Sequence, residues 1–133
     1  MKTDRNVLLV DDEVEFTTPL AKIFSRRGLI VDTANSCSEA LAKMATSPFS
    51  VIVMDVSMPE TNGIQCLAKI RQQWPLSEVI ILTGHASVNS GIEGMKEGAF
   101  DYCLKPTNTS ELLDKIELAF EKVQVNHEQD SWA

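Results

Sequence analysis

The sequence has no long apolar segment, no excess of basic residues and no metal-type pairing of its cysteines. Without a membrane-spanning run or a signal peptide, we expect a cytoplasmic protein with no membrane partner. The net charge of −7, from 19 acidic and 12 basic residues, disfavours direct nucleic-acid binding and a polybasic membrane patch. Cys37, Cys66 and Cys103 are an odd number without paired spacing, which indicates reduced thiols in the cytosol.

What the sequence does have is a regular alternation of short apolar runs and amphipathic stretches. Its 133 residues are enough for one domain with a single substantial core. The runs typical of buried strands are 7–10, 29–34, 51–55, 79–83 and 100–104. The helical stretches are 14–27, from 36 on, 64–74, 88–97 and 108–123. This alternation predicts an α/β fold, a parallel sheet with helices on both faces. We expect the domain to cover 1–123 and the polar tail 124–133 to fray.

Polar side chains stand where the predicted strands end. Asp11 and Asp12 follow the first run, Asp55 closes the third, Thr83 closes the fourth, and Lys105 follows the fifth. Ligands of open parallel sheets bind at the carboxyl ends of the strands, near the switch in strand order. The sequence therefore predicts one shared site with three carboxylates, a hydroxyl and an ammonium group.

This set of groups suits a divalent cation beside a phosphoryl group. The carboxylates of Asp11, Asp12 and Asp55 would repel one another unless a cation lay between them. Oxygen ligands without histidine or cysteine select a hard ion such as Mg²⁺, for which Mn²⁺ can substitute. A carboxylate can also be the nucleophile. Lys105 can balance the phosphoryl charge and the Thr83 hydroxyl can donate to it, which is the positioning and neutralisation that phosphoryl transfer requires.

Four segments in this order resemble the receiver domain of two-component response regulators. They are VDDE at 10–13, MDVSMP at 54–59 with Gly63, LTG at 82–84, and GAFDYCLKP at 98–106. The resemblance covers about residues 5 to 123, and the four motifs together are specific although each alone is weak. It implies a flavodoxin-like (βα)5 fold with a five-stranded parallel sheet in the order 2-1-3-4-5.

The resemblance also implies a signalling chemistry. Asp55 would accept a phosphoryl group from a phosphohistidine on a sensor histidine kinase or a histidine phosphotransfer protein. Asp11, Asp12 and Asp55 would hold Mg²⁺, with the backbone carbonyl of Ser57 as a further ligand. The chain would be a regulatory phosphoacceptor and not a metabolic enzyme, with self-catalysed phosphorylation and slow autodephosphorylation.

The same resemblance implies an output. Lys105 would bind the phosphoryl oxygens, and Thr83 and Tyr102 would form a conformational switch, although the position of Tyr102 also fits a packed edge aromatic. The changed surface, made by the fourth helix, fifth strand and fifth helix, would bind a downstream target, an output domain or a second copy of the chain. The chain would be a stand-alone receiver or a piece of a larger regulator or hybrid kinase.

Two alternatives remain beside this interpretation. A haloacid-dehalogenase-like phosphatase also uses a strand-end aspartate and Mg²⁺, but it requires a second acid two residues after the nucleophile, where Ser57 stands. A degenerate receiver would serve as a constitutive binding module, but every phosphorylation residue is present.

Overall fold

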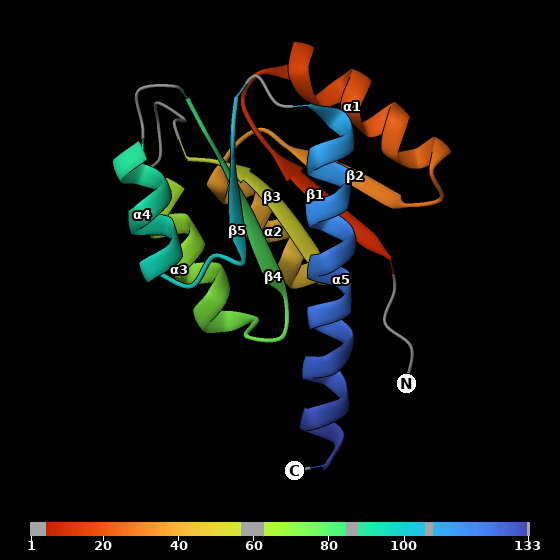
Figure 1. The fold of residues 1–133 in the computed structure, drawn as a ribbon, viewed down its shortest axis with the longest axis vertical. Helices are drawn as coiled ribbons and strands as arrows, with labels where there is room; N and C mark the ends of the chain where they lie inside the picture. Colours follow the sequence, from red (N-terminus) through yellow and green to blue (C-terminus); the bar gives the residue numbers. More distant parts are fainter. Residues whose placement is uncertain (1–4, 57–62, 85–87, 106–107, 133) are drawn as a thin grey trace.

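The structure, a computed structural model, describes residues 5–56, 63–84, 88–105 and 108–132, along which strands and helices alternate (Figure 1). The strands are β1 (Asn6–Val10), β2 (Ile30–Ala34), β3 (Val51–Asp55), β4 (Glu78–Thr83) and β5 (Asp101–Leu104). The helices are α1 (Val14–Arg26), α2 (Cys37–Thr46), α3 (Gly63–Gln73), α4 (Val88–Lys96) and α5 (Thr109–Trp132). These bounds agree with the predicted ones to within one residue, apart from the end of α5 and the end of α2, for which the sequence analysis predicts no bound.

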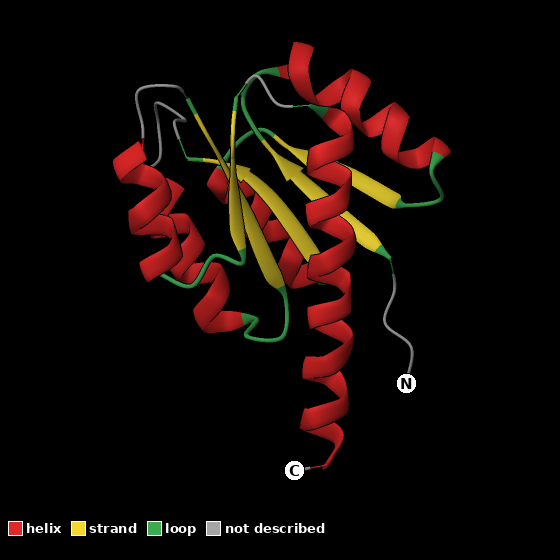
Figure 2. Ribbon diagram, viewed as in Figure 1, coloured by secondary structure: helices red, strands yellow, loops and turns green. Residues whose placement is uncertain are grey.

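The strands form a single parallel sheet in the order β2-β1-β3-β4-β5, which confirms the predicted topology (Figure 2). Leu9 of β1 pairs with Thr33 of β2 on one side and with Val53 of β3 on the other. The switch in strand order therefore falls at β1 and β3, which are neighbours in the sheet although not in the chain. Their carboxyl ends, which lead to Asp11 and Asp55, lie side by side.

Two hydrophobic clusters cover the two faces of the sheet. On one face, Phe24 of α1 and Leu112 of α5 belong to a cluster with Val53 of β3. On the other face, helices α2 and α3 pack against the alternate strand residues, including Ile52 and Met54 of β3. Because both faces are buried, the strands carry near-continuous apolar runs, which is why the sequence located them well.

Local signals set the ends of several helices. The Ser36 hydroxyl accepts a backbone N–H of the first turn of α2 at 3.1 Å, and the Asn108 side chain accepts one at the start of α5 at 2.8 Å. Gly28 and Gly98 follow α1 and α4 with φ of 87° and 102°, a backbone region that glycine occupies most easily.

Helix α5 continues to Trp132, so residues 124–132 are helical where the sequence predicts a frayed tail. Figure 1 shows this part of α5 extending past the end of the sheet. Asn126 Nδ2 donates to the buried Glu78 carboxylate at 2.9 Å, which ties the extension to the start of β4. Polarity alone does not reveal a contact between residues so distant in the chain. Neither α5 nor any other helix among the described residues is long and apolar enough to cross a membrane.

The prediction of three reduced thiols is wrong for two of them. Cys37 at the start of α2 and Cys66 in α3 are joined in a disulfide, with their Cα atoms 6.0 Å apart. Both helices cover the same face of the sheet, and this brings the two residues within the Cα separation that a disulfide requires. Cys103 is buried and takes no part in the disulfide, in agreement with the prediction of a reduced thiol for that residue.

Candidate functional site

The carboxyl ends of the neighbouring strands β1 and β3 hold two buried carboxylates. Asp11 follows β1 and Asp55 closes β3, with exposed fractions of 2% and 3%. The backbone N–H of Asp11 donates to the carbonyl of Ala34 at 3.0 Å, and that of Val56 donates to the carbonyl of Leu82 at 3.1 Å. Each acidic strand end is therefore held in place by the strand beside it.

The acidic residues at this edge form one cluster. One carboxylate oxygen from each of Asp11, Asp12, Glu13 and Asp55 lies within 4.8 Å of the others. Asp12 and Glu13 are exposed, and the Glu13 backbone N–H donates to Asp11 Oδ1 at 2.9 Å, which fixes the turn after β1. An all-oxygen set of this kind, half buried and half open to solvent, could hold a hard divalent cation.

Lys105 places its ammonium group against three of these acids. Its Nζ lies 2.6 Å from Asp11 Oδ2, 2.9 Å from Glu13 Oε1 and 3.3 Å from Asp55 Oδ2. The ammonium also lies 4.5 Å from the centre of the Phe16 ring, in a cation–π geometry. Its side chain is only 14% exposed, so this positive charge stands beside Asp55 with little screening by solvent.

Burial and neighbouring charge shift the protonation of this site. Desolvation raises the pKa of Asp11; hydrogen bonds from Lys105 and from the Glu13 backbone lower it only in part, and the charge of Asp55 raises it further. For Lys105, desolvation alone would lower the pKa, but hydrogen bonds to Asp11 and Glu13 outweigh it, and the pKa is raised. Lys105 is therefore a permanent cation at neutral pH.

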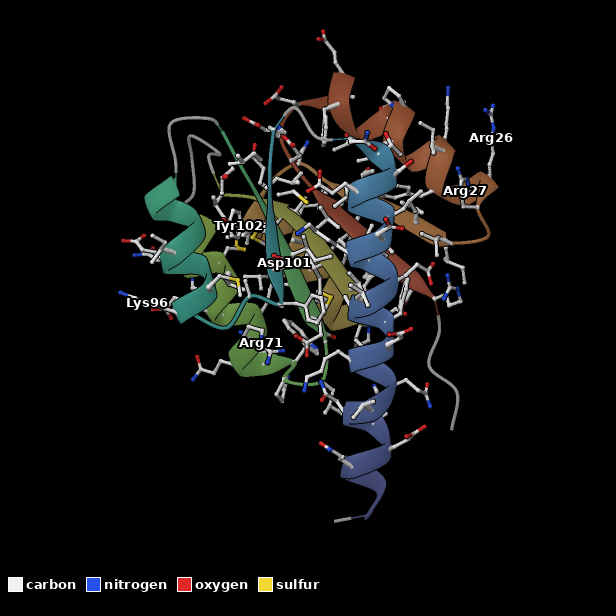
Figure 3. All side chains as sticks on the ribbon, viewed as in Figure 1. Arg26, Arg27, Arg71, Lys96, Asp101 and Tyr102 are labelled. Carbon is white, nitrogen blue, oxygen red and sulfur yellow. A yellow bond between two sulfur atoms is a disulfide. The ribbon has the colours of Figure 1, made fainter. Side chains whose placement is uncertain are left out.

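Thr83 is the last residue of β4, and Tyr102 lies within β5. Thr83 is fully buried, and its hydroxyl has no hydrogen-bond partner among the described residues. Its carbonyl accepts the backbone N–H of Lys105 at 2.7 Å, which joins the two strand ends. Tyr102 is 40% exposed, and its ring lies against Gly91 of α4, where an added Cβ would be 3.3 Å away (Figure 3).

The structure brings Asp11, Asp12, Asp55 and Lys105 together at one edge of the sheet, as the strand ends predict. The predicted backbone ligand Ser57 lies outside the described residues.

Sequence reasoning missed two neighbours of Lys105. The sequence did indicate Glu13, because this residue directly follows the acidic pair Asp11 and Asp12. Phe16 was not singled out as a site residue, because nothing local in the sequence indicates its contact with a lysine so far along the chain.

The sequence model of the response regulator receiver domain matches residues 7–117, most of the chain. The chain belongs to the response regulator receiver domain family. Receiver domains are regulatory modules of two-component signalling, and this membership leaves the phosphatase alternative without support.

Curated relatives of this receiver domain are longer regulators. It is 33% identical over 109 residues to the photosynthetic apparatus regulatory protein RegA of Cereibacter sphaeroides, covering 82% of this chain and 59% of RegA. It is 35% identical over 112 residues to the regulatory protein AtoC of Escherichia coli, covering 84% of this chain and 24% of AtoC. The chain thus spans between about a quarter and three fifths of these relatives.

Solved receiver domains share the whole fold. A receiver domain protein from Clostridium thermocellum superposes with a TM-score of 0.85 at 32% identity, covering 90% of this chain and 97% of that one. The beryllofluoride-activated NtrC4 receiver domain, solved as a dimer, gives a TM-score of 0.84 at 38% identity, covering 90% and 98%.

Proposed function

We propose that this receiver domain is a phosphoacceptor, which takes a phosphoryl group onto Asp55 from a phosphohistidine of a histidine kinase or phosphotransfer protein. The observation that carries the proposal is the ammonium of Lys105, which contacts both Asp11 and Asp55 at the carboxyl edge of the sheet. A fixed cation there favours the charge that gathers on an incoming phosphoryl group.

The acidic cluster fits a bound Mg²⁺ ion. Its ligands are all oxygens, and two of its members face solvent, which suits an ion that keeps several waters. Asp11, Asp12 and Asp55 would hold the ion, with the carbonyl of Ser57 beside them. The ion would supply charge neutralisation between the acceptor and the phosphoryl oxygens. Asp55 presents its carboxylate as the nucleophile, and Lys105 binds and orients the phosphoryl oxygens.

Thr83 and Tyr102 would carry the conformational change that follows phosphorylation of Asp55. The buried Thr83 hydroxyl has no hydrogen-bond partner among the described residues. A phosphoryl oxygen on Asp55 would accept a hydrogen bond from it. Asp55 pairs with Leu82 across the sheet, which puts Thr83 one residue beyond the phosphorylated position. Movement of Thr83 would let the exposed Tyr102 turn inward and change the surface of α4, β5 and α5. This is a local charge event that biases a two-state element.

That surface is the proposed contact with the partner. Besides Tyr102, its elements α4 and β5 carry the exposed apolar side chains of Ile92, Met95 and Leu104. A downstream target, an output domain or a phosphorylated second copy would bind there. The phosphoryl donor would be a histidine kinase. We place the domain in the cytoplasm.

The test is chemical phosphorylation. Wild-type protein incubated with Mg²⁺ and acetyl phosphate should gain one phosphoryl group, seen by intact mass and removed by hydroxylamine, and chelation of Mg²⁺ should prevent the gain. Asp55→Asn should abolish it, whereas Asp32→Asn, on an exposed aspartate of β2, should not. Asp12→Ala should lose most of the thermal stabilisation by Mg²⁺. Undiminished incorporation in Asp55→Asn would refute the proposal.

A further inference from the structure

The disulfide between Cys37 and Cys66 lies outside the acidic cluster and links two neighbouring helices. Cys37 is the first residue of α2, and Cys66 lies in the first turn of α3. Both are buried, with exposed fractions of 5% and 1%. Cys103 belongs to the hydrophobic cluster on the other face of the sheet and takes no part in this disulfide. The bridge therefore ties together the beginnings of α2 and α3 and nothing else among the described residues.

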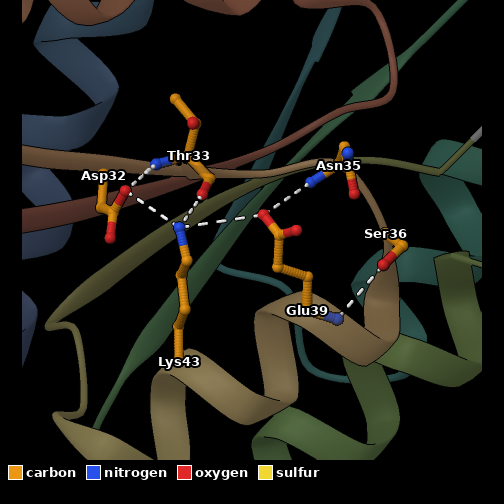
Figure 4. A network of polar contacts seen from close by, with 6 residues as sticks. All are labelled: Asp32, Thr33, Asn35, Ser36, Glu39 and Lys43. Carbon is orange, nitrogen blue, oxygen red and sulfur yellow. Dashed lines mark hydrogen bonds and ion pairs between the residues drawn. The ribbon is translucent and has the colours of Figure 1, made fainter.

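The beginning of α2 is connected to Asp11 through a short, well-bonded segment. Ser36 caps the helix by accepting the backbone N–H of Glu39 at 3.1 Å, and the Glu39 carboxylate accepts the N–H of Asn35 at 3.3 Å (Figure 4). The residue before Asn35, Ala34, accepts the backbone N–H of Asp11 at 3.0 Å. Cys37 stands only three positions after Ala34, whose carbonyl bonds to the backbone of Asp11. A displacement of Cys37 should therefore reach the Asp11 backbone.

The beginning of α3 rests on the residue that follows Asp55. Gly63 lies so close to Val56 that a Cβ on Gly63 would be 2.4 Å from the Val56 Cα. Val56 in turn donates its backbone N–H to Leu82 at 3.1 Å. The disulfide therefore joins a segment that is hydrogen-bonded to Asp11 to a segment that packs against the residue after Asp55.

We propose that Cys37–Cys66 is a thiol–disulfide exchange site whose substrate is a dithiol, and that its oxidation state sets the rate at which Asp55 is phosphorylated. The second half rests on the proposed function. In the reducing cytoplasm, where the proposed function places the domain, disulfides are usually transient and redox-sensing, which favours exchange over a permanent structural bridge. The oxidised form links the beginnings of α2 and α3 covalently, and the reduced form lacks this link.

The exchange is a balanced two-electron step. A thiolate of the dithiol attacks Sγ of Cys37, the more exposed of the two, so that the Cys37–Cys66 bond breaks and the Cys66 thiolate takes up a proton. The second thiol of the reagent then attacks its own sulfur in the mixed disulfide and releases Cys37 as a thiol. The protein gains two electrons and two protons, and the dithiol becomes a cyclic disulfide.

Oxidation should speed phosphorylation because phosphoryl transfer depends on the positions of its groups. A shift of about 1 Å between reacting groups can lower a reaction rate about 100-fold. Reduction, which frees the beginnings of α2 and α3 from each other, should therefore lower the phosphorylation rate by about 3- to 10-fold. The bridge spans a sequence separation of 29 residues, and cross-linking such a loop should raise the Tm by on the order of 10 °C.

The experiment compares the full chain after treatment with oxidised glutathione and with dithiothreitol. Alkylation in denaturant counts the thiols, a thermal melt gives the Tm, and acetyl phosphate with Mg²⁺ gives the phosphorylation rate. The oxidised chain should take one alkyl group, on Cys103, and the reduced chain three. Cys37→Ala should make Tm and rate insensitive to dithiothreitol, whereas Cys103→Ala should keep both responses.

Each outcome decides one half of the proposal. Three alkylated thiols after oxidation would overturn the exchange site. A bridge that forms with equal phosphorylation rates in the two states would overturn its control of Asp55. If neither state is phosphorylated, the proposed function fails and the control with it, while the thiol count still decides the exchange site. A faster oxidised form, with the response lost in Cys37→Ala only, supports both halves.

Discussion

Replacing Thr83 with valine should stabilise the unphosphorylated domain and remove its conformational response to phosphorylation of Asp55. Valine has the shape of threonine with a methyl in place of the hydroxyl, and it suits a buried strand. The Thr83 side chain is fully buried at the end of β4, and its hydroxyl has no partner among the described residues. Such a group has lost its hydrogen bonds to water without gaining others, so its removal relieves a penalty.

The size of the effect follows from that penalty. A buried, unsatisfied polar group costs about 1 to 3 kcal/mol, so a gain of about 1 to 2 kcal/mol in unfolding free energy is expected for Thr83→Val. For 133 residues the unfolding entropy is about 0.28 kcal/mol/K, which makes the Tm about 4 to 7 °C higher. The matched control is Thr17→Val, because the buried Thr17 hydroxyl donates to the carbonyl of Val14 at 3.5 Å. Its Tm should stay level or fall.

Thermal melts of the two variants give the first measurement, and NMR with beryllofluoride gives the second. Thr83→Val should still accept a phosphoryl group on Asp55, but its amide signals in α4 and β5 should shift less than those of the wild type. A lower Tm would mean that the Thr83 hydroxyl has a partner in the resting fold and would contradict the reasoning. An undiminished shift in α4 and β5 would remove Thr83 from the switch.

Two further substitutions test the supports of the site. Gly63→Ala should lower the unfolding free energy by about 1 to 3 kcal/mol, because its Cβ would lie 2.4 Å from a backbone atom. Gly84→Ala, whose Cβ would meet nothing within 4 Å, should stay near the wild type in the same urea titration. Asn126→Ala should cost about 1 to 3 kcal/mol and expose the end of α5 to amide exchange, because the buried Glu78 loses a hydrogen bond. Gln124→Ala, which breaks the exposed hydrogen bond to Glu128, should cost under about 0.5 kcal/mol.

Sequence patterns were most reliable where burial is continuous. Strand β3, Val51–Asp55, was located to the residue because every position in it is buried. Strand β4 begins one residue earlier than predicted, at Glu78, whose charge indicates a loop but whose side chain is buried and bonded to Asn126. The edge of the sheet where Asp55 and Lys105 meet was predictable because the carboxyl ends of parallel strands share an edge.

The disulfide was missed because a rule about compartments took precedence over topology. An odd number of cysteines without metal spacing indicates reduced thiols, but that rule says nothing about which residues lie close in space. The predicted strand order already carried the signal. With β1 between β2 and β3, the crossover helix α2 must pass over β1 and lie beside α3 on the same face. Cys37 and Cys66 both stand in the first turns of these helices. The switch in strand order that gathers the acids at the edge therefore also brings the two sulfur atoms together, which is why a redox change at α2 and α3 should reach Asp55.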